Sequence, residues 1–272
     1  MFGITYFRDF MYGLIMGVTS TIPGISFGTV AILLNIYEKF LDSISLVNIK
    51  KNLTFLIPLC MGCICGIFAF SWLVTFLLTN YEMITYFCFI GMIIGCVPMI
   101  YKRAVSDKIR FRSVALFVAA FVFMLVLAFT SDGSLTNQTL AQLGGITPSL
   151  LAWIFFAAFI SAMAMIIPGI SGSIIMLMLG AYTVAVEAIS TFNLVILFVV
   201  GTGVILGSLA GIRIVKTALR IDSQGLYCAV LGLIIGSIFI VYPGFSQDIT
   251  GVIAIILAAI SAFAIGIFSK RY

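Results

Sequence analysis

The sequence predicts an all-α integral membrane protein built as an inverted repeat, each half with one re-entrant helical hairpin and three transmembrane helices. Of its 272 residues, 63% are hydrophobic and 8% are charged, and the mean hydropathy is +1.29. These values exclude a water-soluble globule with a polar surface. The pentapeptide Ile-Pro-Gly-Ile-Ser also occurs twice, beginning at Ile22 and at Ile167. We therefore divide the chain into a first repeat, 1–131, and a second repeat, 132–272.

The duplication extends beyond the pentapeptide at a constant spacing of 145 residues. Further matched pairs are Leu34 with Leu179, Tyr37 with Tyr182, and Asp42 with Glu187. In each copy a helix-breaking, polar segment interrupts an apolar stretch. In membrane proteins this pattern is typical of a broken helix beside a binding site, and it indicates a transporter.

The segments that flank the first pentapeptide are too short to cross a bilayer. Segments 10–22 and 26–37 have 13 and 12 residues, and at about 1.5 Å per residue each reaches about 20 Å, short of a ~30 Å hydrocarbon core. They predict a re-entrant hairpin. The corresponding segments of the second copy, 150–167 and 171–186, are longer and leave a hairpin and a full span both open.

Six other uncharged stretches have about the length that a transmembrane helix needs. They are 53–79, 83–101, 113–131, 193–212, 226–242 and 249–269. We expect each of them to form one span.

The positive residues predict the orientation of these spans. If the first hairpin enters from the cytoplasm and the later spans alternate, all 14 Lys and Arg residues lie inside, together with both termini. The outer connections then hold Glu82, Asp132 and Asp248, and 132–148 is the one sizeable external loop. Each repeat has an odd number of crossings, so the second is inverted relative to the first. The two hairpin tips should therefore meet near the middle of the bilayer.

The hairpin tips have the composition of an anion site. Proline interrupts the helix, glycine relaxes the backbone, and small polar residues begin the next helix, where free N–H groups and hydroxyls can bind a phosphate or carboxylate. The other interpretation is that Ser26 and Ser171 only cap the restarting helices. The candidate phosphate-binding residues are Pro23, Gly24, Ser26, Gly28 and Thr29 in the first tip and Pro168, Gly169, Ser171, Gly172 and Ser173 in the second.

A second group of candidates lies after the tips and at the inner boundary. An acid beside a membrane cavity can carry a coupling proton, and a basic residue can receive a phosphate head group. The same residues can instead be solvated hairpin ends and ordinary membrane anchors. The candidates for head-group contact or coupling are Tyr37, Glu38, Asp42, Tyr182, Glu187, Arg213 and Lys216.

Other chemistries have little support in the sequence. There is no histidine, and the six cysteines all lie in apolar stretches, where they act as small hydrophobic residues between helices. The few acids form no metal-ligand cluster, and we expect neither a metal nor a cofactor. Basic residues are spread over short loops, which argues against a nucleic-acid partner. We see no cleavable signal and expect the N-terminus to be retained.

The repeated motifs resemble those of the DUF368 family, and the resemblance covers essentially the whole chain. The residues that carry it are Gly13-Leu14-Ile15-Met16-Gly17, Pro23-Gly24-Ile25-Ser26-Phe27-Gly28-Thr29, Ile36-Tyr37-Glu38, Pro168-Gly169-Ile170-Ser171-Gly172-Ser173 and Leu179-Gly180-Ala181-Tyr182. Members of that family are also called polyprenyl-phosphate transporters. The resemblance implies a multi-pass protein of the bacterial cytoplasmic membrane that returns undecaprenyl phosphate from the outer to the cytoplasmic leaflet for synthesis of peptidoglycan and other cell-envelope polymers. The family usually has glycine where this chain has Phe27.

We expect the lipid's head group to cross between the tips while its isoprenoid tail stays in the bilayer, in a proton-coupled or gradient-driven cycle. One alternative is a transporter or channel for a small soluble anion, which has the same inverted repeat. A membrane lipid phosphatase is a weaker alternative, because the chain lacks a histidine nucleophile and a metal-ligand cluster.

Overall fold

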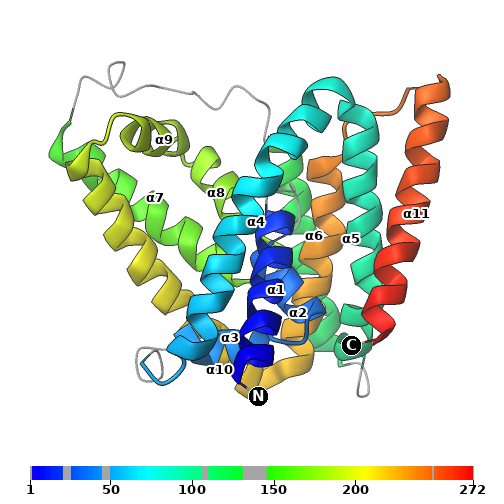
Figure 1. Ribbon diagram of the computed structural model, residues 1–272, viewed down its shortest axis with the longest axis horizontal. Helices are drawn as coiled ribbons and strands as arrows, with labels where there is room; N and C mark the ends of the chain where they lie inside the picture. Colours follow the sequence, from blue (N-terminus) through cyan, green and yellow to red (C-terminus); the bar gives the residue numbers. More distant parts are fainter. Residues whose placement is uncertain are drawn as a thin grey trace.

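The computed structural model describes residues 2–20, 26–44, 50–105, 110–130, 146–246 and 248–271, and in these parts the chain is helical and has no strand. The helices are α1 (Phe2–Ser20), α2 (Phe27–Leu33), α3 (Tyr37–Ile44), α4 (Leu53–Asn80), α5 (Glu82–Ala104), α6 (Phe111–Thr130), α7 (Pro148–Ile166), α8 (Gly172–Met178), α9 (Tyr182–Ser190), α10 (Leu194–Val241) and α11 (Ile249–Arg271) (Figure 1).

Within these described parts, six helices are long and apolar enough to cross a membrane. They are α4, α5, α6, α7, α10 and α11. The predictions of an all-helical chain and of a multi-pass membrane protein are therefore confirmed.

Helix α10 differs from the sequence prediction. The predicted spans 193–212 and 226–242 lie in one 48-residue element, whose only non-helical residue is Asp222 (φ −153°, ψ 80°). The Asp222 carboxylate accepts a hydrogen bond of 2.9 Å from the backbone N–H of Gly225, which satisfies one of the free donors at the start of the following helix. α10 is thus two helices that meet at an elbow, and the segment between the predicted spans is helical.

The short helices α2 and α8 have seven residues each, fewer than the sequence predicted for these segments, whereas α1 begins earlier, at Phe2. In the second half, the indole N–H of Trp153, near the start of α7, donates a hydrogen bond of 2.9 Å to the carbonyl of Leu179, at the end of α8. The chain therefore turns back after α7. Between α8 and α9 the chain bends by 110°.

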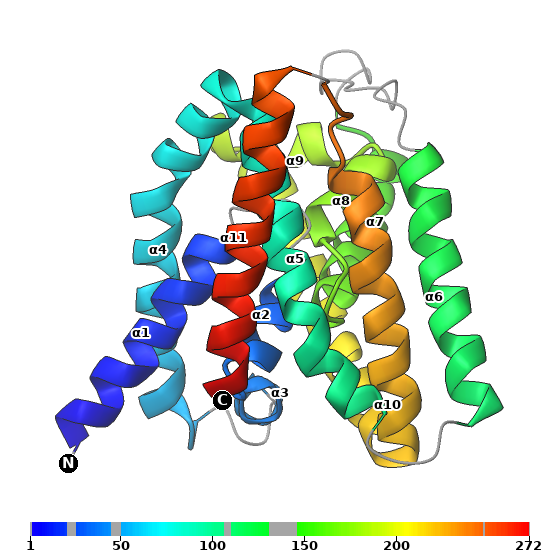
Figure 2. The same ribbon diagram turned by 90° about the vertical axis from the view of Figure 1, so that its right-hand side faces the viewer.

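The ends of the molecule carry different short helices. Figures 1 and 2 both place α3 at the end where the two termini lie and α9 at the opposite end. α1 rises from the end with the termini and stops about midway through the fold (Figure 2). The main core surrounds α2 and includes buried residues of α5 and α10.

Four helix pairs make the largest contacts: α1 with α4, α7 with α10, α5 with α11, and α6 with α10. Glycines allow all four pairs to approach to backbone contact, and α1 with α4 and α7 with α10 are two examples. A Cβ at Gly17 of α1 would lie 2.1 Å from the carbonyl oxygen of Cys63, and one at Gly207 of α10 would lie 2.1 Å from that of Phe159. Small residues that let helices pack this closely are typical of membrane interfaces.

Candidate functional site

The beginning of α2 contacts the Pro-Gly turn between α7 and α8. The Ser26 hydroxyl oxygen accepts a hydrogen bond of 2.8 Å from the backbone N–H of Gly169. Beside it, a Cβ at Gly28 would lie 3.2 Å from Pro168. The predicted site residues Pro23 and Gly24 lie outside the described residues. The structure thus brings the beginning of α2 and the second Pro-Gly turn together, although they are more than 140 residues apart in the sequence.

Ser26 is at the centre of this contact. It is buried, and its hydroxyl also lies 2.9 Å from the Thr29 hydroxyl and accepts a hydrogen bond of 3.3 Å from the Thr29 N–H. Ser26 is therefore the N-cap of α2, as one of the two interpretations of the sequence expected, and it also contacts the other tip.

The second tip is held against α10. Gly169 has φ +93°, a conformation that favours glycine, and a Cβ there would lie 2.9 Å from Leu233 and 3.0 Å from Ile234. Both its backbone conformation and its surroundings require glycine.

Ser171 differs from its counterpart Ser26. It makes no side-chain capping bond to α8. Its hydroxyl instead lies 2.8 Å from that of Ser173, which is exposed. The second tip thus presents two hydroxyl groups at an accessible position, whereas the hydroxyls of the first tip bond to the protein.

Helices α2 and α8 differ in burial in the same way as Ser26 and Ser171 do. Six of the seven residues of α2 are buried, and Ala31 and Ile32 are completely inaccessible. In α8 only Gly172 is buried, and Ser173 and Leu177 are exposed. The fold is therefore closed around α2 and open around α8.

The two predicted tyrosines also differ. Tyr37 is 2% exposed and donates a hydrogen bond of 2.9 Å from its hydroxyl to the carbonyl of Ile166, the last residue of α7. Burial, followed by the proximity of Tyr227, raises the pKa of Tyr37 above its usual range. Tyr182 is 41% exposed at the start of α9. Of these two tyrosines, Tyr37 thus bonds to the opposite half of the chain, beside the second tip.

Next to Tyr37 lies a group of polar residues that the sequence analysis did not select. The Arg103 guanidinium, in the last turn of α5, donates hydrogen bonds of 3.0 Å to the Tyr227 hydroxyl and 2.5 Å to the Asn35 side-chain oxygen. It also lies over the Tyr227 ring, 5.6 Å from the ring centre. We call Asn35, Arg103 and Tyr227 the Arg103 cluster. The three members of the cluster come from distant parts of the sequence, and the fold brings them together.

Three predicted charged residues gather between α3 and α10. Glu38, Asp42 and Lys216 line one cavity of about 290 Å³, together with Arg220 and Ser223. Lys216 Nζ lies 2.6 Å from an Asp42 carboxylate oxygen. Glu187 is not part of this group, because it lies on α9, at the opposite end of the molecule (Figure 1).

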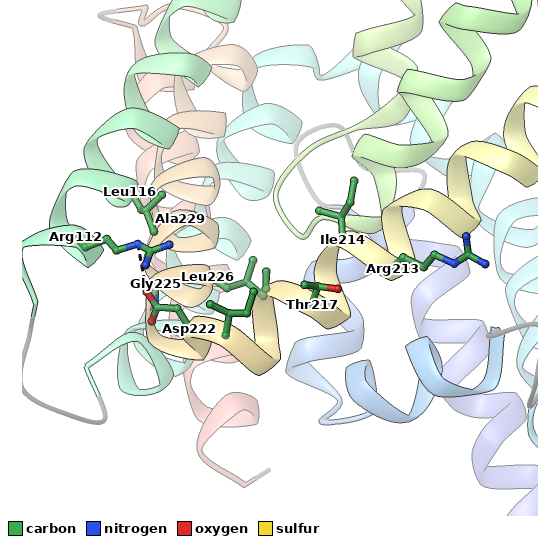
Figure 3. A pocket seen from close by; sticks show the side chains of 11 residues that line it. Arg112, Leu116, Arg213, Ile214, Thr217, Asp222, Gly225, Leu226 and Ala229 are labelled. Atoms are coloured by element: carbon green, nitrogen blue, oxygen red, sulfur yellow. Dashed lines mark hydrogen bonds and ion pairs between the residues drawn. The ribbon is translucent and has the colours of Figure 1, made fainter.

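Arg213 lies in a different cavity from Lys216. It lines a mostly apolar cavity of about 540 Å³ between α6 and the elbow of α10, with Arg112, Thr217 and Asp222. In Figure 3 the Arg213 guanidinium points away from Arg112, which instead faces Asp222 at 3.9 Å. The two arginines therefore do not converge on one anion.

The family described as "VCA0040-like: Undecaprenyl phosphate translocase-like" matches residues 16–256. The chain belongs to this family. The match includes both tips and every helix between them.

Two curated relatives cover most of the chain. A protein named polyprenyl-phosphate transporter from Staphylococcus aureus (strain NCTC 8325 / PS 47) is 30% identical over 253 residues, which are 89% of this chain and 88% of the relative. A protein of the same name from Vibrio cholerae serotype O1 (strain ATCC 39315 / El Tor Inaba N16961) is 27% identical over 256 residues, 88% of this chain and 79% of the relative. No solved structure matches the chain.

Proposed function

We propose that this protein is a translocase that returns undecaprenyl phosphate, or a closely similar polyprenyl phosphate, from the outer to the cytoplasmic leaflet of a bacterial cell membrane. Its membership of the family and the names of its two relatives support the substrate. The hydrogen bond between Ser26 and Gly169 carries the mechanism, because it brings donors of both tips to one place inside the fold. A phosphate that takes the place of this hydrogen bond accepts hydrogen bonds from the Gly169 N–H and from the hydroxyls of Ser26 and Thr29.

We also propose that residues 1–131 and 132–272 are inverted repeats with re-entrant hairpins. The positions of the breaks between full spans support this. Tyr81 separates α4 from α5, and Asp222, which interrupts α10, lies 141 positions later at the corresponding place in the second half. Asn52 and Asn193, the N-caps of α4 and α10, have the same separation. Equivalent residues of the two halves are thus 145 positions apart in the hairpins and 141 positions apart from the start of the first full span.

Helix packing supports the same relation. The contact of α1 with α4 corresponds to that of α7 with α10, and the contact of α5 with α11 corresponds to that of α10 with α6. Matching glycines approach matching carbonyl oxygens, and the pairs are Gly62–Phe10, Gly66–Leu14, Gly203–Phe155 and Gly207–Phe159. The positions of α3 and α9 at opposite ends agree with an inversion (Figure 1).

The end with α3 and the termini is cytoplasmic in this proposal. Helix α5 begins with Glu82 at one end and has Lys102 and Arg103 in its last turn at the other. The positive-inside rule assigns the end rich in lysine and arginine to the cytoplasm. The closed region around α2 is then on the cytoplasmic side, and the open region around α8 faces the outside.

The lipid enters from the outer leaflet in this arrangement. Its phosphate first meets the exposed hydroxyl pair of Ser171 and Ser173 and then passes to the donors at Ser26, while the isoprenoid tail remains in hydrocarbon. This route avoids the high cost of moving an unpaired phosphate through lipid. The cycle is driven by protons or another gradient, for which Glu38, Asp42 and Glu187 are the candidate acids.

The tips can be tested in cells that lack other carriers for this lipid. We expect Ser26→Ala and Ser171→Ala together to increase the undecaprenyl phosphate exposed on the cell surface, as measured with a labelled ligand of the lipid phosphate. Ser246→Ala, which removes a half-buried hydroxyl that bonds to Asp248 after α10, is the matched control. If the double variant clears the lipid from the surface as well as the wild type does, the tips do not bind the phosphate.

A further inference from the structure

We propose that the Arg103 cluster is a second binding site for a phosphate monoester, which receives the lipid head group on the cytoplasmic side of the closed tips. This inference rests on the proposed function. It assigns a role to Asn35, Arg103 and Tyr227, which were not among the residues predicted from the sequence.

Arg103 carries a positive charge that no acid of the described residues neutralises in an ion pair. Its guanidinium is half-buried, yet both of its side-chain hydrogen-bond partners are neutral. No carboxylate oxygen of the described residues lies within the 4 Å of an ion pair with it. The acids of α3, Glu38 and Asp42, line the cavity with Lys216 and Arg220. A partly buried guanidinium is stabilised by an anion, and phosphate fits its planar set of donors well.

The cluster also offers donors and has no acidic acceptor. Tyr227 is 5% exposed, and its hydroxyl oxygen accepts from Arg103. Its own O–H hydrogen has no acceptor among the described residues, and a buried donor of this kind is costly unless a ligand satisfies it. Asn35 uses its oxygen to accept from Arg103, which leaves its NH₂ group to donate. Guanidinium, phenol and amide donors in one place are suited to phosphate oxygens.

The backbone at Asn35 has a left-handed conformation. Asn35 has φ 56°, and Gly180, which occupies the matching turn between α8 and α9, has φ 68°. Glycine satisfies this left-handed turn without strain, and asparagine is one of the few other residues that tolerate it. The first half therefore has a side chain where the turn itself does not need one. That side chain binds Arg103.

The position of the cluster fits a receiving site. Asn35 is two residues before Tyr37, whose hydroxyl reaches Ile166 at the second tip. Tyr37 and Tyr227 are close enough to interact electrostatically. Asn35 itself is exposed at the end of α2, on the side of the fold that holds α3. A phosphate that leaves Ser26 toward this side meets Arg103 before it reaches the solvent.

Binding of farnesyl phosphate to the purified full-length chain in detergent tests the site, with farnesol as the probe that lacks the phosphate. We expect Arg103→Gln to weaken binding of farnesyl phosphate at least tenfold and to leave binding of farnesol unchanged, because a charge-assisted contact is lost. Lys102→Gln is the matched control: it removes the same charge from the neighbouring, exposed position of α5, and we expect it to stay within twofold of the wild type.

Two further variants keep the test decisive if Arg103→Gln does not fold. Tyr227→Phe removes only the O–H group, and Asn35→Gly keeps the left-handed turn as Gly180 does. We expect each to weaken binding of farnesyl phosphate severalfold while the protein still elutes as a folded species. Unchanged affinity in the folded variants, or equal losses for Arg103→Gln and Lys102→Gln, would overturn the site.

The same proteins in liposomes separate this inference from the proposed function. If the wild type moves polyprenyl phosphate across the bilayer while Arg103→Gln binds farnesyl phosphate normally, the Arg103 site is wrong and the proposed function stands. If the wild type binds farnesyl phosphate through Arg103 but moves no lipid, the proposed translocation is wrong.

Discussion

Replacing Ser26 by alanine should destabilise the protein far more than the same change at Ser171, although the two serines occupy equivalent positions in the repeated motif. In the structure the Ser26 hydroxyl accepts from the buried Gly169 N–H at 2.8 Å and also bonds to Thr29. The Ser171 hydroxyl has a bond to exposed Ser173. The two substitutions remove the same atom from different surroundings.

The expected magnitude follows from what each substitution leaves behind. Thr29 keeps its backbone bond to the Ser26 carbonyl at 3.0 Å, so the Gly169 N–H is the donor left without a partner. A buried donor left unsatisfied costs about 1–3 kcal/mol. Loss of an exposed hydroxyl changes stability by about 0.5 kcal/mol or less. We therefore expect Ser26→Ala to lower the free energy of unfolding by about 1–3 kcal/mol and Ser171→Ala to leave it nearly unchanged.

Unfolding of the purified variants in mixed micelles of increasing SDS content, followed by far-UV circular dichroism, measures this difference. A farnesyl phosphate titration of the same samples reports whether the remaining donors still bind an anion. Equal losses of stability for Ser26→Ala and Ser171→Ala would refute the inference that the Ser26 hydroxyl closes the tips.

Three further predictions concern packing, charge and pH. Gly207→Ala should destabilise the fold by about 1–3 kcal/mol, because its Cβ would lie 2.1 Å from a carbonyl oxygen of α7. A Cβ at Gly201, on the same helix, would have no atom within 4 Å, so Gly201→Ala should stabilise the fold by up to about 1 kcal/mol through helix propensity. Thermal unfolding of the two variants measures the difference. Lys216→Gln should cost less than about 1 kcal/mol, and less still in high salt, because its partner Asp42 is 65% exposed; unfolding at two salt concentrations measures this. The raised pKa of Tyr37 makes its contribution to stability constant below the ordinary tyrosine pKa of about 10. Above that pH the contribution falls, because the unfolded chain releases a proton that the folded chain retains. The free energy of unfolding of Tyr37→Phe should therefore fall less than that of the wild type in an alkaline unfolding series.

The membrane class and the helical elements could be predicted from the sequence because they depend on local properties. Long apolar stretches define α4, α5, α6 and α11, and a Pro-Gly pair marks each break. The junction within α10 was less predictable. Its charged residues suggested a break between two spans, but a helix tolerates charge at the membrane boundary, and only Asp222 leaves the helical conformation.

The candidate site was predictable only in part. The repeated motif selected Ser26 and Gly169, which do contact each other. It did not predict that Ser26 is buried and Ser171 accessible, because identical motifs acquire different surroundings when one half of a fold is closed and the other open. The Arg103 cluster depends on contacts 68 and 124 residues apart in the sequence. Its one sequence signal is Asn35 at the position where the second half has Gly180.

Translocation of the lipid is tested most directly with the purified protein in liposomes that contain labelled undecaprenyl phosphate. The fraction of the lipid in each leaflet is measured with and without a pH gradient. The proposed function predicts that the wild type moves the labelled lipid between leaflets faster than protein-free liposomes do, and that the gradient changes its final distribution. Lipid that stays in its original leaflet, or uptake of inorganic phosphate in liposomes that lack the lipid, would contradict it.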